Sequence, residues 1–242
     1  MNGVGSLEIH NLGVAYLRLE ALTGISVQVQ PGRLTGIIGP NGAGKTTLLK
    51  AMLGLIGIRE GLVLYHDQPL QKQLELVAYV PQRSQIDWTY PATVWDVVMM
   101  GRVRKTGWFR SFSPTSRRLV QEALGRVGMD GYKDRPIGQL SGGQQQRVFL
   151  ARSLVQEADI FCFDEPFGGI DWKTEKIIFD ILHELAAAGK IVLVVNHDLG
   201  ESITNFEDLI LLNRKLIAAG KRKNVLTDNH LYRAYRGKVV FL

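Results

Sequence analysis

Two separate stretches of the sequence carry residues suited to holding phosphate. Residues 39–47 read GPNGAGKTT, a glycine-rich turn with one lysine and two threonines. Residues 140–144 read LSGGQ, which places a serine and two glycines at the start of an amphipathic segment. Free backbone amides and the positive end of a helix dipole favour an anion at such a helix start. The second stretch lacks the lysine that the first one has. A role must therefore be found for a second phosphate-binding segment in the same chain.

The first stretch fits the pattern G-x-x-x-x-G-K-[ST] after an apolar run and before a helix-forming segment. We expect its backbone amides to surround the phosphates of ATP, with Lys45 bridging the β- and γ-phosphates. Thr46 would bind the Mg²⁺ of Mg-ATP, and Thr47 would reach the α-phosphate. A chance glycine turn is the weaker interpretation. The residues assigned to ATP binding here are Gly39, Pro40, Asn41, Gly42, Ala43, Gly44, Lys45, Thr46 and Thr47.

A second chemical feature is the apolar run IFCFDEP, which ends in two adjacent carboxylates. We expect Asp164 to bind Mg²⁺ and Glu165 to be the base that polarises the attacking water. Gln82, in YVPQ, could contact both Mg²⁺ and this water, and His197, after IVLVVN, could contact the γ-phosphate. Taken alone, a glutamine after Val-Pro is weak evidence, and a lone histidine is more often a capping or surface residue.

Composition narrows the class of protein. The chain has 242 residues, a net charge of +6 and one cysteine, so an intrachain disulfide or a cysteine-rich metal site is excluded. Cys162 lies in an apolar run, which indicates inert packing. No stretch approaches 18 apolar residues and no secretion signal is present, so we expect a soluble, intracellular protein. The basic residues are dispersed without a nucleic-acid-binding motif, and charge alone does not decide the partner.

The pattern of apolar residues predicts an α/β fold. Short alternating segments over 7–30 predict antiparallel strands, and helical periodicity dominates from 83 to 157. We expect a P-loop NTPase core with a mostly parallel sheet, an N-terminal antiparallel β subdomain and an inserted α-helical subdomain. The whole chain, 1–242, would be one domain. Its parts would be the core (1–82 and 158–220), the helical subdomain (83–157) and a C-terminal tail (221–242).

Together these motifs resemble the ATP-binding subunit of ABC transporters, because LSGGQ follows a phosphate loop and precedes FDEP. The resemblance covers residues 7–220. It implies that Tyr16 stacks on adenine, that Gln82 links the two subdomains and that Asp171 crosses a dimer. Without it, Tyr16 would be read as a structural strand residue. The catalytic set that follows from residues and resemblance is Glu165, His197, Gln82 and Lys45.

The resemblance also explains the second phosphate device. In the head-to-tail dimer of the family, Ser141, Gly142 and Gly143 close over ATP bound to the partner chain. Ser141 and Gln144 have the spacing of a capping box, which fixes the helix start. We therefore assign Ser141, Gly142, Gly143, Gln144 and Asp171 to ATP binding. The chain departs from many members at Gly168–Ile170, which precede Asp171, and at Asn196, where metal-importer relatives often have a histidine.

The resemblance implies an ATPase that powers transport across the cytoplasmic membrane through a separate permease. The segments 79–109 and 164–171 look most like bacterial manganese, zinc and iron importers. We expect a homodimer on the cytoplasmic face of the membrane, linked indirectly to a substrate-binding protein, with no nucleic acid bound. Arg83–Tyr90 would meet the permease, although Trp88 and Tyr90 could instead be subdomain core. The alternatives are a soluble ABC ATPase acting on nucleic acid or ribosomes and, less well supported, a small-molecule P-loop kinase.

Overall fold

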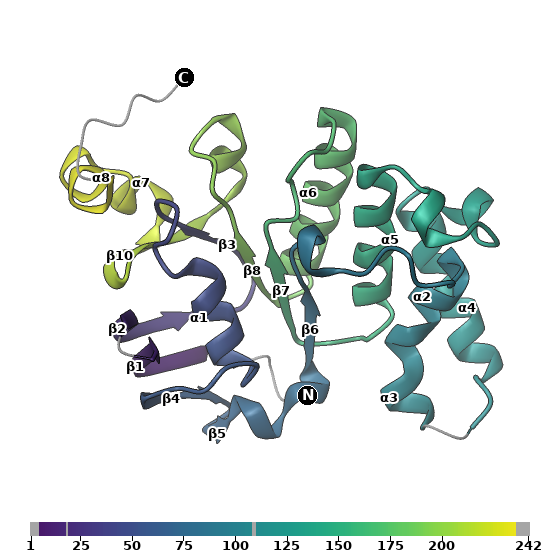
Figure 1. The fold of residues 1–242 in the computed structure, drawn as a ribbon, viewed down its shortest axis with the longest axis horizontal. Helices are drawn as coiled ribbons and strands as arrows, with labels where there is room; N and C mark the ends of the chain where they lie inside the picture. The colour runs from purple at the N-terminus through teal and green to yellow at the C-terminus, as the bar shows by residue number, and fades with distance from the viewer. Residues whose placement is uncertain (1–4, 18, 108–109, 236–242) are drawn as a thin grey trace.

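The computed structural model describes residues 5–17, 19–107 and 110–235, which form two sheets and their covering helices (Figure 1). The smaller sheet is antiparallel and has the strand order β2-β1-β4-β5. Its strands are β1 (Leu7–Tyr16), β2 (Leu19–Val29), β4 (Glu60–Tyr65) and β5 (Gln68–Pro69). The antiparallel strands expected over 7–30 are therefore present, and the turn after β2 leads the chain into the larger sheet.

The larger sheet has the order β10-β9-β3-β8-β7-β6; β10 pairs with β9 in the antiparallel sense, and the other neighbours pair in parallel. Its strands are β3 (Arg33–Ile38), β6 (Val77–Val80), β7 (Ile160–Asp164), β8 (Ile191–Val195), β9 (Asp208–Asn213) and β10 (Lys215–Lys221). The prediction of a mostly parallel sheet is confirmed. Because parallel strands end at one edge, the loops after β3, β6, β7 and β8 open on the same side of the sheet.

The parallel strands of the larger sheet are buried on both faces, and their side chains alternate between two hydrophobic clusters. In β7, Phe161 and Phe163 pack with the helical elements and α6, whereas Ile160 and Cys162 pack with α1 and the antiparallel sheet. This is the two-residue period of a strand that is covered on both sides. Cys162 is fully buried and unpaired, as the apolar run IFCFD suggested.

In the described residues between 83 and 157 every regular element is helical, which agrees with an inserted helical subdomain; the subdomain boundaries stay a prediction. The α-helices are α1 (Lys45–Met52), α2 (Val94–Met99), α3 (Val103–Thr106), α4 (Pro114–Arg126), α5 (Gly142–Leu154), α6 (Trp172–Ala187), α7 (Arg222–Val225) and α8 (Asp228–Tyr235). The 3-10 turns are η1 (Leu70–Lys72), η2 (Leu74–Leu76), η3 (Arg83–Gln85), η4 (Met100–Arg102), η5 (Asp130–Tyr132), η6 (Ile137–Gln139) and η7 (Glu201–Asn205).

Two helices, α7 and α8, occupy the region that the sequence suggested to be a C-terminal tail. Both pack on the β9–β10 hairpin, and Leu231 and Ala234 of α8 are buried there. Residues 236–242 of the expected tail lie outside the described residues. In the described part of the chain, no helix has the length and apolar character that crossing a bilayer requires.

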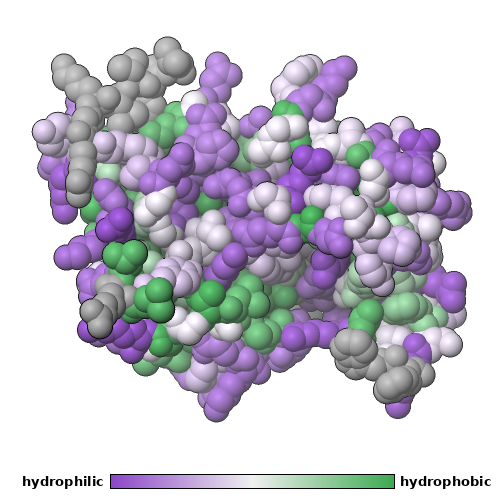
Figure 2. All heavy atoms as spheres, in the orientation of Figure 1, coloured by the Kyte–Doolittle hydropathy of each residue, from purple (hydrophilic) through white to green (hydrophobic). Residues whose placement is uncertain are grey.

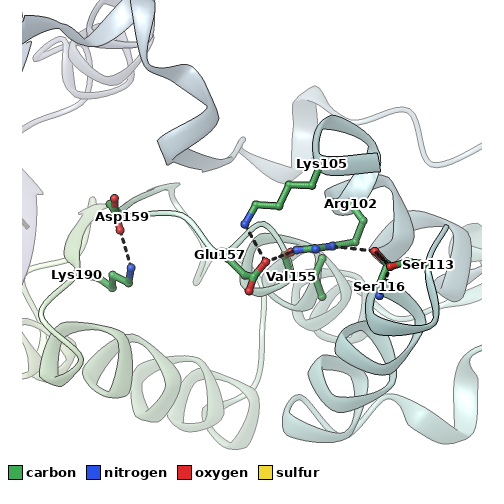
Figure 3. A network of polar contacts seen from close by, with 8 residues as sticks. All are labelled: Arg102, Lys105, Ser113, Ser116, Val155, Glu157, Asp159 and Lys190. Carbon is green, nitrogen blue, oxygen red and sulfur yellow. Dashed lines mark hydrogen bonds and ion pairs between the residues drawn. The ribbon is translucent and has the colours of Figure 1, made fainter. Parts of the chain in front are cut away.

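A network of hydrogen bonds and ion pairs connects the helical elements to the segment between α5 and β7 (Figure 3). Arg102 is 6% exposed and donates to the Val155 carbonyl (2.7 Å) and to Glu157 Oε2 (2.5 Å). Lys105 Nζ donates to the same Glu157 oxygen at 2.8 Å, and Arg102 Nε lies 3.4 Å from Ser116 Oγ in α4. The network therefore joins η4, α3 and α4 to the segment that follows α5.

Candidate functional site

The phosphate loop runs from the end of β3 to the start of α1. Lys45 is 6% exposed, and its Nζ donates to the carbonyls of Gly39 (2.8 Å) and Pro40 (3.1 Å). Burial lowers the pKa of Lys45, while the negative charges of Glu165 and Asp164 oppose this shift. Gly39 has a φ of +150°, and a Cβ there would lie 2.1 Å from the Leu212 carbonyl oxygen, so no other residue fits.

Thr46, in the first turn of α1, contacts Asp164, the last residue of β7. Thr46 Oγ1 donates to Asp164 Oδ1 at 2.8 Å. Asp164 is fully buried, and its other carboxylate oxygen has no well-formed hydrogen bond to the described residues. Burial raises the pKa of Asp164, because the charged carboxylate loses its hydration. A hydroxyl beside a carboxylate matches the oxygen ligands that Mg²⁺ takes in nucleotide sites, so the residues present fit this ion.

Gln82, Glu165 and His197 meet at the carboxyl edge of β6, β7 and β8. Gln82 Nε2 donates to Glu165 Oε2 at 2.7 Å, and His197 Nδ1 lies 3.9 Å from the same oxygen. Glu165 has a φ of +50°, which is rare for a residue with a side chain. Such backbone strain is common at functional sites, and here it turns the carboxylate toward Gln82 and His197.

The start of α5 has the capping geometry that the sequence predicted. The Gln144 amide donates to Ser141 Oγ (3.3 Å), and the Ser141 amide donates to Gln144 Oε1 (2.9 Å), which confirms the capping box. Gly143 faces α6, because a Cβ at this position would lie 3.1 Å from Thr174 Oγ1. Asp171 caps α6 by accepting from the Thr174 amide (3.0 Å). The two helix starts therefore meet at Thr174.

The residues assigned to ATP binding and hydrolysis fall into two separate groups in the structure. Lys45, Thr46 and Asp164 lie together, and Gln82 and His197 reach the adjacent Glu165. The start of α5, with its signature stretch 141–144, belongs to a different part of the molecule, because β7 and β8 separate α1 from α5 (Figure 1). The glycine-rich starts of α1 and α5 therefore belong to helices on different sides of β7 and β8.

Tyr16 lies at the exposed end of β1. Its side chain is 49% exposed, and Leu17 and Leu19 beside it are more exposed still. Figure 2 shows hydrophobic residues gathered over this side of the molecule, near β1, β2 and α1. An open apolar surface of this kind suits a flat ring, and the adenine contact of Tyr16 stays a prediction.

Arg83 is a residue that the motif analysis did not place in the nucleotide site. Arg83 Nε donates to Gln145 Oε1 at 3.0 Å, and its guanidinium lies close to Gly142 at the start of α5. The residue after Gln82 therefore touches the signature helix directly. In the sequence, the position of Arg83 directly after Gln82 is the feature that could have suggested a role at this site. A change at Arg83 would disturb α5 as well as the surface, so it cannot test permease docking alone.

Trp88 and Tyr90 border a small apolar groove on the helical elements. Trp88 stacks edge-on against Phe149 at 5.4 Å between ring centroids, so it belongs in part to the local core. Tyr90 is 60% exposed. The groove has a volume of about 220 Å³ and adjoins a cleft of about 520 Å³. The residues that line the groove are Ile86, Asp87, Trp88, Tyr90, Val97, Met100, Ile137, Phe149 and Arg152.

The parallel sheet and the loop before α1 define the class of protein as a P-loop ATPase. The family model described as "ABC transporter" matches residues 22–168, and the chain belongs to this family. It is accordingly an ATP-hydrolysing subunit that works with membrane permease components.

Curated relatives match nearly the whole chain. A probable ABC transporter ATP-binding protein of Cyanophora paradoxa is 53% identical, covering 93% of this chain and 92% of the relative. The manganese transport system ATP-binding protein MntB of Halalkalibacterium halodurans is 46% identical, covering 96% and 93%. The zinc transport system ATP-binding protein TroB of Treponema pallidum is 44% identical, covering 97% and 88%.

Solved structures have the same fold. An ATP-binding cassette of an ABC transporter in its ADP conformation superposes with a TM-score of 0.82 at 26% identity, covering 96% of this chain and 98% of that one. A putative metal-chelate type ABC transporter in an inward-facing conformation gives a TM-score of 0.84 at 24% identity, covering 96% and 90%. These superpositions confirm the fold class expected from the sequence.

Proposed function

We propose that this ATPase powers the import of a divalent transition metal, manganese, zinc or iron, through a separate permease. The proposal is supported by the relatives, whose names specify manganese and zinc transport systems. Manganese comes before zinc because more of the similar relatives carry a manganese name than a zinc name; among them is MntB of Bacillus subtilis, which is 45% identical over 98% of this chain. The function as an ATPase acting on nucleic acid or ribosomes is not favoured, since the relatives named above are transport subunits.

The observation that carries the catalytic proposal is the 2.7 Å contact of Gln82 with Glu165, next to the 2.8 Å contact of Thr46 with Asp164. Glu165 would accept a proton from the attacking water, and His197 would hold that water near the γ-phosphate. Lys45 would exchange its two backbone carbonyls for phosphate oxygens. Mg²⁺, held by Thr46, Asp164 and Gln82, would neutralise phosphate charge.

We infer that two copies of the chain complete each ATP site. Ser141 and Gly142 lie at the accessible start of α5, where a helix favours an anion, and β7 and β8 separate this helix from α1, which begins at Lys45 (Figure 1). A twofold dimer brings the helix start of one copy to the phosphate loop of the other, and the same surfaces then form both sites. Asp171, which touches α5 through Thr174, would lie in that interface.

The permease would contact the groove beside Trp88 and Tyr90. An exposed aromatic residue at the rim of an apolar groove is suited to anchor a helix. Arg83 joins this surface to α5, so a movement of α5 on dimer closure would reach the permease. In this arrangement the chain lies on the cytoplasmic face of the membrane, and a substrate-binding protein acts on the permease from the other side.

The direct test of this function is reconstitution of the chain with its permease in lipid vesicles. ATP hydrolysis would be measured with substrate-binding protein loaded in turn with manganese, zinc or iron. We expect one loaded form to stimulate hydrolysis above the metal-free form. Equal hydrolysis with every loaded and metal-free form would contradict the metal assignment, whereas absence of any ATP hydrolysis would contradict the catalytic one.

A further inference from the structure

The C-terminal helix α8 lies against the outer side of the phosphate loop. A cleft of about 600 Å³ separates the two and is bordered by residues from three parts of the chain. These residues are Pro40, Asn41 and Gly42 of the loop, Asn213, Arg214 and Lys215 at the β9–β10 turn, and Ala234 and Tyr235 of α8. The helix α8 is thus next to the phosphate loop, although about 190 residues separate the two in the sequence.

Specific contacts fix α8 in this place. Asn213, the last residue of β9, donates from Nδ2 to the Ala234 carbonyl at 2.8 Å. Leu231 and Ala234 are 3% and 0% exposed, so one face of the helix is buried. The His230 amide donates to Thr227 Oγ1 at 3.3 Å, which caps the start of the helix. The end of α8 is therefore held where β9 reaches the phosphate loop.

Tyr235 is the residue through which α8 approaches the loop itself. Its hydroxyl oxygen is buried without a well-formed hydrogen bond and lies beside the backbone amide of Gly39. Burial raises the pKa of Tyr235 to about 12, although the Gly39 amide acts in the opposite direction. Gly39 is also the residue whose carbonyl accepts from Lys45 at 2.8 Å. One residue therefore connects the C-terminal helix to the catalytic lysine.

The neighbouring β9–β10 turn supports the other end of the loop. The Arg214 amide donates to the Ala43 carbonyl at 2.9 Å, and the Arg214 carbonyl accepts from the Thr23 amide of β2 at 2.9 Å. The Leu212 carbonyl occupies the space that a Cβ on Gly39 would need. The loop is thus supported from outside at Gly39 and at Ala43.

We propose that α8 is a positioning element for the phosphate loop and that Tyr235 is its positioning residue. A loop that is already ordered loses less conformational entropy when ATP binds, so bracing raises nucleotide affinity. Tyr235 lies outside the loop and does not reach the catalytic carboxylates, so it acts on binding rather than on hydrolysis of bound ATP. The inference rests on ATP binding by this loop.

The test compares two tyrosines of the same helix in the full-length chain. Tyr235→Ala removes the whole aromatic ring, and Tyr235→Phe removes only its hydroxyl. Tyr232→Ala is the matched control, because the side chain of Tyr232 is 64% exposed. We expect Tyr235→Ala to raise both the Kd for Mg-ATP and the KM about fivefold, with kcat unchanged at saturating ATP. Tyr235→Phe should show a smaller increase, and Tyr232→Ala none.

Equal ATP affinity in Tyr235→Ala and Tyr232→Ala would overturn the proposal. So would a loss of kcat with KM unchanged. If Tyr235→Ala fails to fold, two milder variants decide: Tyr235→Phe removes the buried hydroxyl beside Gly39, and Asn213→Ala removes the hydrogen bond to the Ala234 carbonyl. A Kd equal to that of the wild type in both would refute the proposal. Lys45→Ala separates this inference from the assigned site: equal ATP binding by the wild type and Lys45→Ala would overturn the phosphate-loop assignment instead.

Discussion

Glu165 sits in a strained backbone conformation at the point where three strand ends meet. Its φ of +50° turns the side chain toward Gln82 Nε2, which donates to it at 2.7 Å. This contact gives the carboxylate a fixed orientation before ATP arrives. Because Gln82 is also the residue from which the chain enters the helical elements, the orientation of the proposed base depends on where those elements lie.

The first prediction concerns this carboxylate. Glu165→Gln preserves the shape of the side chain but removes its capacity to accept a proton. We expect ATP binding to be retained and hydrolysis to fall by about 10²- to 10⁴-fold, as for loss of a general base. The ATP-bound dimer should then persist, because the closed state no longer resolves. Binding and turnover would be measured on the purified chain.

Glu122→Gln is the matched control, since Glu122 lies on the exposed side of α4. Its turnover should equal that of the wild type. If Glu165→Gln retained near-wild-type hydrolysis, Glu165 could not be the base.

At the scale of elements, α5 is fixed at both ends by contacts that the sequence did not reveal. Its start meets α6 through Gly143 and Thr174, and the segment after its end is tied to Arg102 and Lys105 through Glu157. These contacts therefore connect α5 to α6 at its start and to η4 and α3 at its end.

The second prediction tests the Glu157 network. The hydrogen bonds from Lys105 and Arg102 lower the pKa of Glu157 below its usual value. Glu157→Ala leaves the buried Arg102 without its carboxylate, so we expect the free energy of unfolding at pH 7 to fall by about 1 kcal/mol. Chemical denaturation measures this change. Glu122→Ala, in an exposed pair with Arg118, should change it by less than about 0.5 kcal/mol.

The sign of the pH dependence follows from the lowered pKa. Glu157 contributes stability above the pKa of an unfolded glutamate, about 4.3, and this contribution is lost as the pH falls through the lower folded pKa. The difference between wild type and Glu157→Ala should therefore shrink in acid. A difference that grew below about pH 4 would contradict the network.

Local patterns in the sequence predicted the elements and most of the candidate site, because each motif lies at the end of its own strand or helix. The apolar runs before Gly39, Gln82 and Glu165 indicated parallel strands, and the capping spacing of Ser141 and Gln144 marked the helix start. The contacts of Arg83 with Gln145 and of Tyr235 with Gly39 could not be predicted. They join segments distant in the sequence, and their side chains follow no motif.

At the scale of the whole molecule, the separation of the phosphate loop from the start of α5 leads to a prediction about assembly. Ser141→Arg places a bulky cation at the start of α5 without touching the chain's own phosphate loop. We expect ATP binding to be retained, ATP-driven dimerisation to be lost and hydrolysis to fall with it. Sedimentation and ATP turnover would be measured together. Mixing this variant with Lys45→Ala should restore one composite site and part of the activity.

A stable Ser141→Arg monomer with full ATPase activity would show that the second device is not used in trans. Absence of recovery in the mixture, despite dimer formation, would also contradict the composite site.

The groove beside Trp88 gives a prediction about coupling. Tyr90→Ala removes an exposed ring and leaves the stacking of Trp88 on Phe149 in place. We expect basal ATPase activity of the isolated chain to be unchanged and metal transport by the complex with the permease to fall several-fold. Leu62→Ala, on the exposed side of β4, is the control and should affect neither. Undiminished transport in Tyr90→Ala would exclude this residue as an anchor.

The central claim is that ATP hydrolysis by this chain drives divalent metal import. Its most direct test is the manganese, zinc and iron content of a deletion strain grown at limiting metal, complemented with either the wild type or Glu165→Gln. We predict that the deletion lowers the cell content of one metal, manganese before zinc, and that only the wild-type chain restores it. Unchanged content of all three metals, or full restoration by Glu165→Gln, would contradict the account.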